Sequence, residues 1–479
     1  MTSVHTLTIS WRLFAAVCVA ASRLPAQSFP PNPKVDALFA EWNKTTTPGC
    51  ALGVVQNGKF IYERGYGMAN LDYDIPNSPR LIYYVGSDSK QFTAASIALL
   101  VLDGKISLSD DVRKYVPEMP NYSATYGVPV TIDNLVHHTS GIRDIYTLMD
   151  LAGLRMEDVM PDSVALALIA RQKELNFKPG TEYLYSNSGY WLLGQIVQRV
   201  SGKSLRLFAD ERMFAPLGMT HTHFHDDPGH VMKNRAMSYM PDSAHGFRIS
   251  YLQNFDKIGA GGLYTTIEDL LKWDDNFYSH KVGGDALQNL IHTRGILNGR
   301  DTITYAFGNE VSSYRGLATD EHGGSLMGYR AHILRFPSQH FSVIETCNLG
   351  TIDPGSIARK VADVYLGDRL KQATVASRPA GPRQQSAGQR TPARLGATEL
   401  QALAGDYYSD ELDAMYHVVV DGDHLALRRP LARSTPLVAA DSNAFRAGSL
   451  VLHFERSRDG APAFTVEAGR VRDIRFRRR

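Results

Sequence analysis

The chain has 479 residues, of which 43% are hydrophobic and 21% charged, and its formal net charge at pH 7 is +2. This length exceeds one ordinary core, so we expect a globular protein of at least two domains. The near-neutral charge argues against a polyanionic partner, so we predict no nucleic-acid binding.

The first 27 residues have the pattern of an export signal. Arg12 supplies a positive charge, residues 13–21 are apolar, and residues 24–26 resemble a cleavage site before Gln27. The apolar run is too short for a stable transmembrane helix, and we find no other run of that length. We therefore predict an exported protein, periplasmic or extracellular, without a stable membrane span.

After this segment the chain keeps two cysteines, Cys50 and Cys347. They form neither the framework of a disulfide-rich domain nor a zinc pattern, and both lie in apolar, strand-like runs. We expect both to be buried free thiols.

The N-terminal elements lead to a serine. Residues 33–43 predict a short helix, and two strand-like runs flank the hairpin signal Asn57-Gly58. Ser87 follows a strand-like run, residues 81–85, and precedes a helix-like run, residues 92–102. At the start of a helix the backbone N–H groups lack helical partners and the dipole favours negative charge, so an oxyanion is stabilised there.

Lys90 lies three residues after Ser87, on the same helical face. A serine needs a base to become a nucleophile, and a lysine that burial keeps neutral can serve. The alternative is a capping serine beside a solvated lysine, and on these residues alone that alternative is the more frequent one.

The middle of the chain holds further polar groups. His137 and His138 lie in a polar turn, and we interpret them as structural. Tyr185 and Asn187 lie two residues apart before a helix, so their side chains can point the same way; the alternative is a core aromatic and a helix cap. No metal is predicted at the histidines of residues 221–225, because their order does not match the zinc signature that they superficially resemble.

The end of the first domain has a glycine pair before two strand-like runs. His322, Gly323, Gly324 and Ser325 precede these runs, and paired glycines allow a backbone to approach a ligand closely; the alternative is a simple turn. Residues 371–394 lack Leu, Ile and Phe and predict a linker. Short alternating runs in residues 395–479 predict a small antiparallel β domain without a catalytic cluster.

Three motifs occur in order at wide spacing: Ser87-x-x-Lys90, Tyr185-x-Asn187 and His322-Gly323-Gly324. Together they resemble the serine β-lactamase and penicillin-binding-protein superfamily, most of all its branch of class C β-lactamases, D-aminopeptidases, DD-carboxypeptidases and esterases. The resemblance covers residues 33–367.

The resemblance implies an α/β (α+β) fold. A central antiparallel sheet flanked by helices would join an all-helical region, with the site between them. The C-terminal β domain resembles the lipocalin-like domains appended to this branch. The same fold would place Cys50 and Cys347 in neighbouring strands.

The resemblance also implies roles. Ser87 would attack the acyl carbon, while Lys90 and Tyr185 share the proton transfers, through a neutral lysine or an ionised tyrosine. Asn187 would orient Lys90 and the substrate, and the N–H groups of Ser87 and Ser325 would form the oxyanion hole. The third motif, His322, Gly323 and Gly324, would line the substrate side. No metal or organic cofactor is implied, and the substrate would be a small acyl ester or peptide.

The third motif departs from the usual Lys-Thr-Gly. His322 and Gly323 remove a fixed cation and a hydroxyl that usually help to hold a substrate carboxylate. We therefore predict an esterase or a D-peptidase or carboxypeptidase that turns over short esters faster than β-lactams. The alternatives are a β-lactamase proper and a non-catalytic, penicillin-binding-like sensor.

Overall fold

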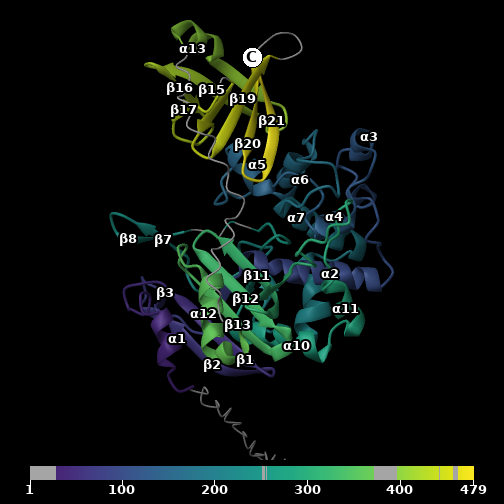
Figure 1. Cartoon of the computed structure of the whole chain (residues 1–479), viewed down its shortest axis with the longest axis vertical. Helices are drawn as coiled ribbons and strands as arrows, with labels where there is room; N and C mark the ends of the chain where they lie inside the picture. The colour runs from purple at the N-terminus through teal and green to yellow at the C-terminus, as the bar shows by residue number, and fades with distance from the viewer. Residues whose placement is uncertain (1–28, 251–253, 255, 372–395, 442, 457–461) are drawn as a thin grey trace, which may run out of the picture.

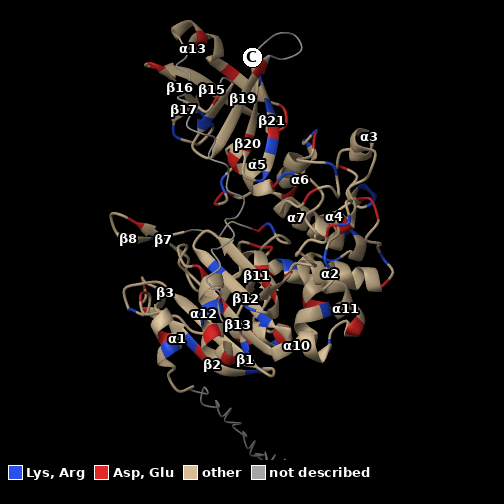
Figure 2. Cartoon of the chain, viewed as in Figure 1, with Lys and Arg blue, Asp and Glu red and all other residues tan. Residues whose placement is uncertain are grey.

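The computed structural model describes residues 29–250, 254, 256–371, 396–441, 443–456 and 462–479. The predicted export signal lies outside these residues, as does the predicted linker apart from Lys371. The described chain forms an α/β body and a C-terminal barrel (Figure 1), which confirms the predicted fold class. Acidic and basic residues are interspersed over both parts (Figure 2). Within the described ranges, no helix combines the length and the hydropathy needed to cross a bilayer.

A six-stranded antiparallel sheet forms the centre of the body, in the order β10-β11-β12-β13-β1-β2. Its strands are β1 (Cys50–Gln56), β2 (Lys59–Tyr66), β10 (Glu310–Tyr314), β11 (Leu317–Leu326), β12 (Tyr329–Phe336) and β13 (Phe341–Cys347). The first and last parts of the body therefore meet where β1 pairs with β13.

Helices cover both faces of the sheet. Leu52 and Val54 of β1 pack in one cluster with α1 (Pro33–Leu38) and α12 (Pro354–Leu366). Ala51 and Val55 belong to the cluster on the other face, with α2 (Lys90–Leu102) and α10 (Ile267–Ser279). Alternate side chains of a strand point to opposite faces, so a strand covered on both sides is apolar throughout.

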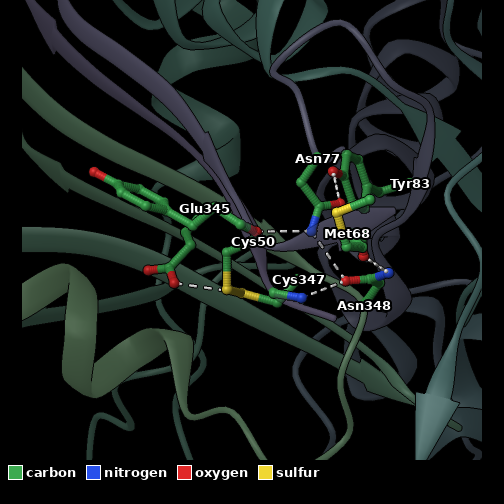
Figure 3. Close-up of a disulfide and its surroundings, with 9 residues drawn as sticks. Cys50, Met68, Asn77, Tyr83, Glu345, Cys347 and Asn348 are labelled. Carbon is green, nitrogen blue, oxygen red and sulfur yellow. Dashed lines mark hydrogen bonds between the residues drawn. A yellow bond between two sulfur atoms is a disulfide. The ribbon is translucent and has the colours of Figure 1, made fainter. Parts of the chain in front are cut away.

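Cys50 and Cys347 are directly opposed in β1 and β13 and form a disulfide (Figure 3). Their predicted burial in neighbouring strands is confirmed, but the expectation of free thiols was wrong. The reason is register, because two residues 297 positions apart in the sequence become cross-strand partners. Next to the bond, the Asn348 amide binds the Gly49 N–H and the Met68 carbonyl, which ties the adjoining chain segments together.

Helices form a second region beside the sheet, and α2 runs through it with both its sides buried. The other helices are α3 (Tyr122–Tyr126), α4 (Ile132–Val136), α5 (Ile145–Ala152), α6 (Asp162–Ala170), α7 (Asn187–Ser201), α8 (Leu205–Ala209), α9 (Ala215–Leu217) and α11 (Gly284–Ile291). A small three-stranded sheet has the order β5 (Tyr83–Tyr84), β9 (Leu263–Thr265) and β6 (His223–Phe224). In one two-stranded sheet β3 (Met68–Asn70) pairs with β4 (Ile75–Pro76). In another, β7 (Tyr239–Asp242) pairs with β8 (Gly246–Ile249). The strand β5 leads directly into the Ser87 turn.

The C-terminal part is a closed barrel of eight antiparallel strands that follows helix α13 (Ala397–Leu403). Its strands are β14 (Gly405–Ser409), β15 (Ala414–Asp421), β16 (His424–Arg428), β17 (Thr435–Ala439), β18 (Ala444–Ala447), β19 (Leu450–Arg456), β20 (Pro462–Ala468) and β21 (Val471–Arg478). Stacked aromatic side chains such as Tyr407, Phe464 and Phe476 are fully buried in its core. The barrel is therefore filled by its own side chains, as expected for this strand number.

The barrel is docked on the helical region through a buried ion pair. Arg143 donates to Glu411 of the barrel at 2.8 Å, and both side chains are almost fully buried. Glu411 also accepts from the Lys173 N–H at 2.8 Å, and Arg143 donates to the Asp473 carbonyl at 3.2 Å. Charges removed from water in this way must stay paired, so the interface depends on both partners.

We expect Glu411→Ala to lower the free energy of unfolding by about 3 kcal/mol, because it leaves the Arg143 guanidinium buried without its anion. The neighbouring Asp410 pairs with Lys173 at 3.6 Å and is half-exposed, so Asp410→Ala should cost under about 1 kcal/mol. Urea unfolding followed by tryptophan fluorescence compares the two variants. Equal losses in both would contradict a specific role for the Arg143–Glu411 pair.

Candidate active site

Ser87 lies in a short 3₁₀ turn, η1 (Gly86–Ser89), which runs into α2. Its side chain is half-buried, whereas Lys90 is fully buried at the start of the helix. The Lys90 Nζ lies 3.0 Å from the Ser87 Oγ. The predicted pair is therefore within hydrogen-bond distance, and the lysine is not the solvated residue of the alternative reading.

Two carbonyl oxygens hold the Lys90 amine from its other sides. Asn187 Oδ1 lies at 3.0 Å and the Ala260 carbonyl at 2.6 Å. Burial lowers the pKa of Lys90 well below its usual value, Asp144 opposes the shift, and Arg470 reinforces it. The lysine can therefore lose its proton far more easily than a lysine in water.

Tyr185 lies beside this pair. Its ring centroid is 4.8 Å from the Lys90 Nζ and packs against His138 at 4.2 Å. Its buried hydroxyl faces Ser87 without reaching the geometry of a hydrogen bond. Burial raises the pKa of Tyr185 well above its usual value, and Ser87 offsets this only in part. The tyrosine is therefore held in its protonated form.

Asp144 orients Asn187, although no sequence pattern singled this aspartate out. Its Oδ2 accepts from the Asn187 N–H at 2.7 Å and from the side-chain amide at 2.8 Å. This bond sets the amide orientation, because the nitrogen must face Asp144 and the oxygen Lys90. The Oδ1 caps α5 through the N–H groups of Tyr146 and Thr147. An Asp before a helix is a common cap, so its second role leaves no local signal.

His322 of the third motif lies on β11 and is buried. Its Nε2 lies 3.0 Å from the Tyr305 hydroxyl and its Nδ1 2.7 Å from the Gly323 carbonyl. Burial, aided by the nearby Lys90, lowers the pKa of His322 to about 3. The ring is therefore neutral at pH 7 and supplies no cation.

Gly324, two residues after His322, permits a close approach between β11 and the Ser87 turn. A Cβ on Gly324 would lie 1.8 Å from the Val85 carbonyl oxygen and 3.1 Å from the Ser87 nitrogen. On the other side, a Cβ on Gly86 would lie 2.6 Å from the Ser325 nitrogen. The backbone nitrogens of Ser87 and Ser325 thus lie on facing segments packed without intervening side chains.

These residues line a cleft of about 1550 Å³, and the barrel forms part of its wall. Ser87, Tyr185, Asn187 and His322 come from the α/β body, whereas Ser449, Leu450 and Arg470 come from the barrel. The sequence predicted no cluster of functional residues in the β domain, so the contribution of the barrel is a finding of the structure.

The other histidines lie in different surroundings. The ring nitrogens of His137 lie 3.1 Å from two backbone carbonyls, and His138 packs on Tyr185 while its Nδ1 accepts the Ser186 N–H. The Nε2 of His223 lies 3.3 Å from the Nδ1 of His225. Within the described part of the chain, only Cys50, Glu345 and Cys347 bring three possible metal ligands close together, and both cysteines are committed to the disulfide.

The α/β body matches a protein family and several known proteins. The beta-lactamase family model matches residues 35–365. A D-aminopeptidase of Gluconobacter oxydans is 28% identical over 301 residues, 63% of this chain and 56% of that protein. Protein flp of Staphylococcus aureus is 30% identical over 312 residues, 64% of this chain and 60% of that protein. The match thus spans less than two thirds of these relatives.

Solved structures show the same fold. A penicillin-binding protein homologue from Pyrococcus abyssi, described as octameric, superposes with a TM-score of 0.62 at 24% identity, covering 93% of this chain and 99% of that one. A D-amino acid amidase from Ochrobactrum anthropi gives 0.59 at 18% identity, covering 71% and 100%. The chain therefore belongs to the beta-lactamase and penicillin-binding-protein superfamily of serine hydrolases.

Proposed function

We propose that this protein is an exported serine hydrolase that forms an acyl-enzyme on Ser87 and cleaves small esters or the amide bonds of D-amino-acid derivatives. The observation that carries the proposal is the buried amine of Lys90, held between two carbonyl oxygens and the Ser87 hydroxyl. A non-catalytic sensor has no need of a preorganised base beside the serine.

Burial favours a neutral amine as the base, because it lowers the pKa of Lys90. A neutral amine has two N–H donors and one lone pair, and the two carbonyl oxygens can only accept. Asn187 and Ala260 thus take both donors, which leaves the lone pair for the Ser87 hydroxyl proton. Since burial keeps Tyr185 protonated, the neutral lysine is the better of the two bases that the resemblance allows.

The reaction then follows from the positions of these groups. Lys90 takes the Ser87 proton as the Oγ attacks the acyl carbon, and the N–H groups of Ser87 and Ser325 stabilise the oxyanion. Tyr185 gives its proton to the leaving group and recovers one from Lys90. Water then attacks the acyl carbon and loses a proton to the same pair. The bond to the Ser87 Oγ breaks, the pair returns the proton to that oxygen, and the acid leaves.

Two features support export. The disulfide between Cys50 and Cys347 is a bond that persists in oxidising compartments and is rare in a reducing cytosol. The signal-like pattern of residues 1–27 points to the same compartment. We therefore assign the protein to the periplasm or the extracellular space.

A substrate panel tests the reaction class. We expect p-nitrophenyl butyrate to be hydrolysed with a kcat/KM at least about tenfold above that of nitrocefin, because the neutral His322 cannot replace the usual cation of the third motif. Hydrolysis of D-alanine p-nitroanilide, compared with hydrolysis of its L-enantiomer, tests for amidase activity on D-amino-acid derivatives. The D-aminopeptidase and D-amino acid amidase relatives suggest that activity. Faster turnover of nitrocefin would favour a β-lactamase proper instead.

A further inference from the structure

Arg470 reaches the active site from the barrel. It follows β20 and precedes β21, and its guanidinium carbon lies 4.5 Å from the centroid of the Tyr185 ring. One of its Nη atoms lies 3.9 Å from the Asp144 Oδ2. The residue lines the same cleft as Ser87.

The backbone of this turn is fixed to the helical region. Asn176 donates to the Arg470 carbonyl at 2.9 Å and accepts from the Arg472 N–H at 2.8 Å. The Arg472 side chain pairs with Glu182 at 3.1 Å. The turn is therefore held on both sides of Arg470, and this attachment directs its side chain into the cleft.

The guanidinium retains free hydrogen-bonding capacity. Its side chain is 46% exposed; among the described residues its guanidinium contacts the Tyr185 ring and the Asp144 carboxylate but makes no hydrogen bond. Two other arginines line the cleft, but Arg330 donates to backbone carbonyls and Arg359 to Glu321. Within the described part of the cleft, Arg470 is thus the arginine whose guanidinium makes no hydrogen bond to the protein.

We propose that Arg470 binds a carboxylate of the substrate, and so sets specificity for acidic substrates at the Ser87 site. The proposal rests on the proposed function. A guanidinium is always charged and offers a planar fork of donors that matches a carboxylate. Because it enters the cleft beside Tyr185 and Asp144 rather than at His322, it would hold a carboxylate placed differently from the one that the usual third-motif cation binds.

The carboxylate beside Arg470 does not favour the opposite specificity, for an ammonium group. Asp144 is the carboxylate next to Arg470, and both its oxygens already accept hydrogen bonds from Asn187 and α5. The nearby guanidinium offsets its charge as well. A substrate amine placed there would face Arg470 and a carboxylate without a free acceptor site.

Matched substrates separate charge recognition from catalysis. The first pair is p-nitrophenyl hydrogen glutarate and p-nitrophenyl butyrate, which differ by a carboxylate on the acyl group. The second is N-acetyl-D-alanyl-D-alanine and its C-terminal amide, which differ on the leaving group. The variants are Arg470→Gln and Arg470→Lys, with Arg446→Gln as the control, because Arg446 is exposed on β18 of the same barrel and does not line the cleft.

We expect Arg470→Gln to lower kcat/KM by about tenfold or more for the acidic member of at least one pair, mainly through KM, because a hydrogen-bonded ion pair is lost. The neutral members should stay within about threefold, Arg470→Lys should retain part of the preference, and Arg446→Gln should match wild type. Equal losses on both members of each pair would overturn the proposal and make Arg470 a residue that tunes Lys90 or Tyr185. Unchanged kinetics would overturn it as well. Labelling of Ser87 by a fluorophosphonate reports separately on the proposed function.

Discussion

Replacing Ser87 with alanine should abolish hydrolysis and covalent labelling while leaving the fold unchanged. The substitution removes the atom that forms the acyl-enzyme, so we expect kcat to fall by at least about 10⁴-fold. Ser87 is half-buried and its Oγ has Lys90 as its partner, so truncation should cost no more than about 1 kcal/mol of stability. Fluorophosphonate labelling, ester turnover and circular dichroism measure the three quantities.

Ser449 provides the matched control. It is exposed, comes from the barrel and lines the same cleft, but among the described residues its hydroxyl has no hydrogen bond to a basic side chain. Ser449→Ala should therefore label and turn over ester as the wild type does. Turnover that survives in Ser87→Ala, or labelling that disappears in Ser449→Ala, would show that the nucleophile is assigned to the wrong residue.

The sequence predicted those parts of the candidate site whose residues are close neighbours along the chain. Ser87 and Lys90 are three residues apart at the start of one helix, and Tyr185 and Asn187 are two apart at the start of another. Gly324 was predicted to let the backbone approach a ligand; the structure shows instead that it lets β11 approach Val85 and the Ser87 turn. Each prediction needed only one element and its neighbouring turn.

The parts that were missed depend on contacts between distant segments. The Cys50–Cys347 bond needs the register of β1 against β13, which the sequence does not encode locally. Asp144 looks like any helix cap until Asn187 is placed against it. Arg470 looks like a polar residue in a barrel turn until the barrel is docked on the helical region.

Barrel docking and catalytic geometry share one short segment. Arg143 binds Glu411 of the barrel, and the next residue, Asp144, binds Asn187, which contacts Lys90. The barrel thus contacts the site twice, through this segment and through Arg470. The barrel, which the sequence presents as a separate domain, therefore forms part of the wall of the candidate active site. It also contacts the segment that positions Asn187.

Lys90 offers the sharpest test of the proposed base. Lys90→Arg keeps a positive charge that cannot be given up, whereas Lys90→Met keeps the length without a charge. If the amine acts as a base, both variants should lower the rate of acylation by about 10³-fold. If only a positive charge were needed, arginine would preserve the rate. Single-turnover release of p-nitrophenol measures acylation directly, and Lys114→Arg, at an exposed lysine, is the control.

The pH dependence adds an independent readout of the same group. Burial lowers the pKa of Lys90 well below its ordinary 10.5, so the neutral form becomes available at a lower pH than for an exposed lysine. Below this lowered pKa the amine is protonated, its lone pair is occupied, and it cannot accept the Ser87 proton. The kcat/KM for a neutral ester should therefore be low in acid and rise with pH through the pKa of Lys90, reaching its plateau well before pH 10.5.

His322, whose pKa is held at about 3, cannot produce a rise near neutral pH. A rate that stays constant from pH 5 to 9 in wild type, together with activity in Lys90→Arg, would contradict the neutral lysine as the base.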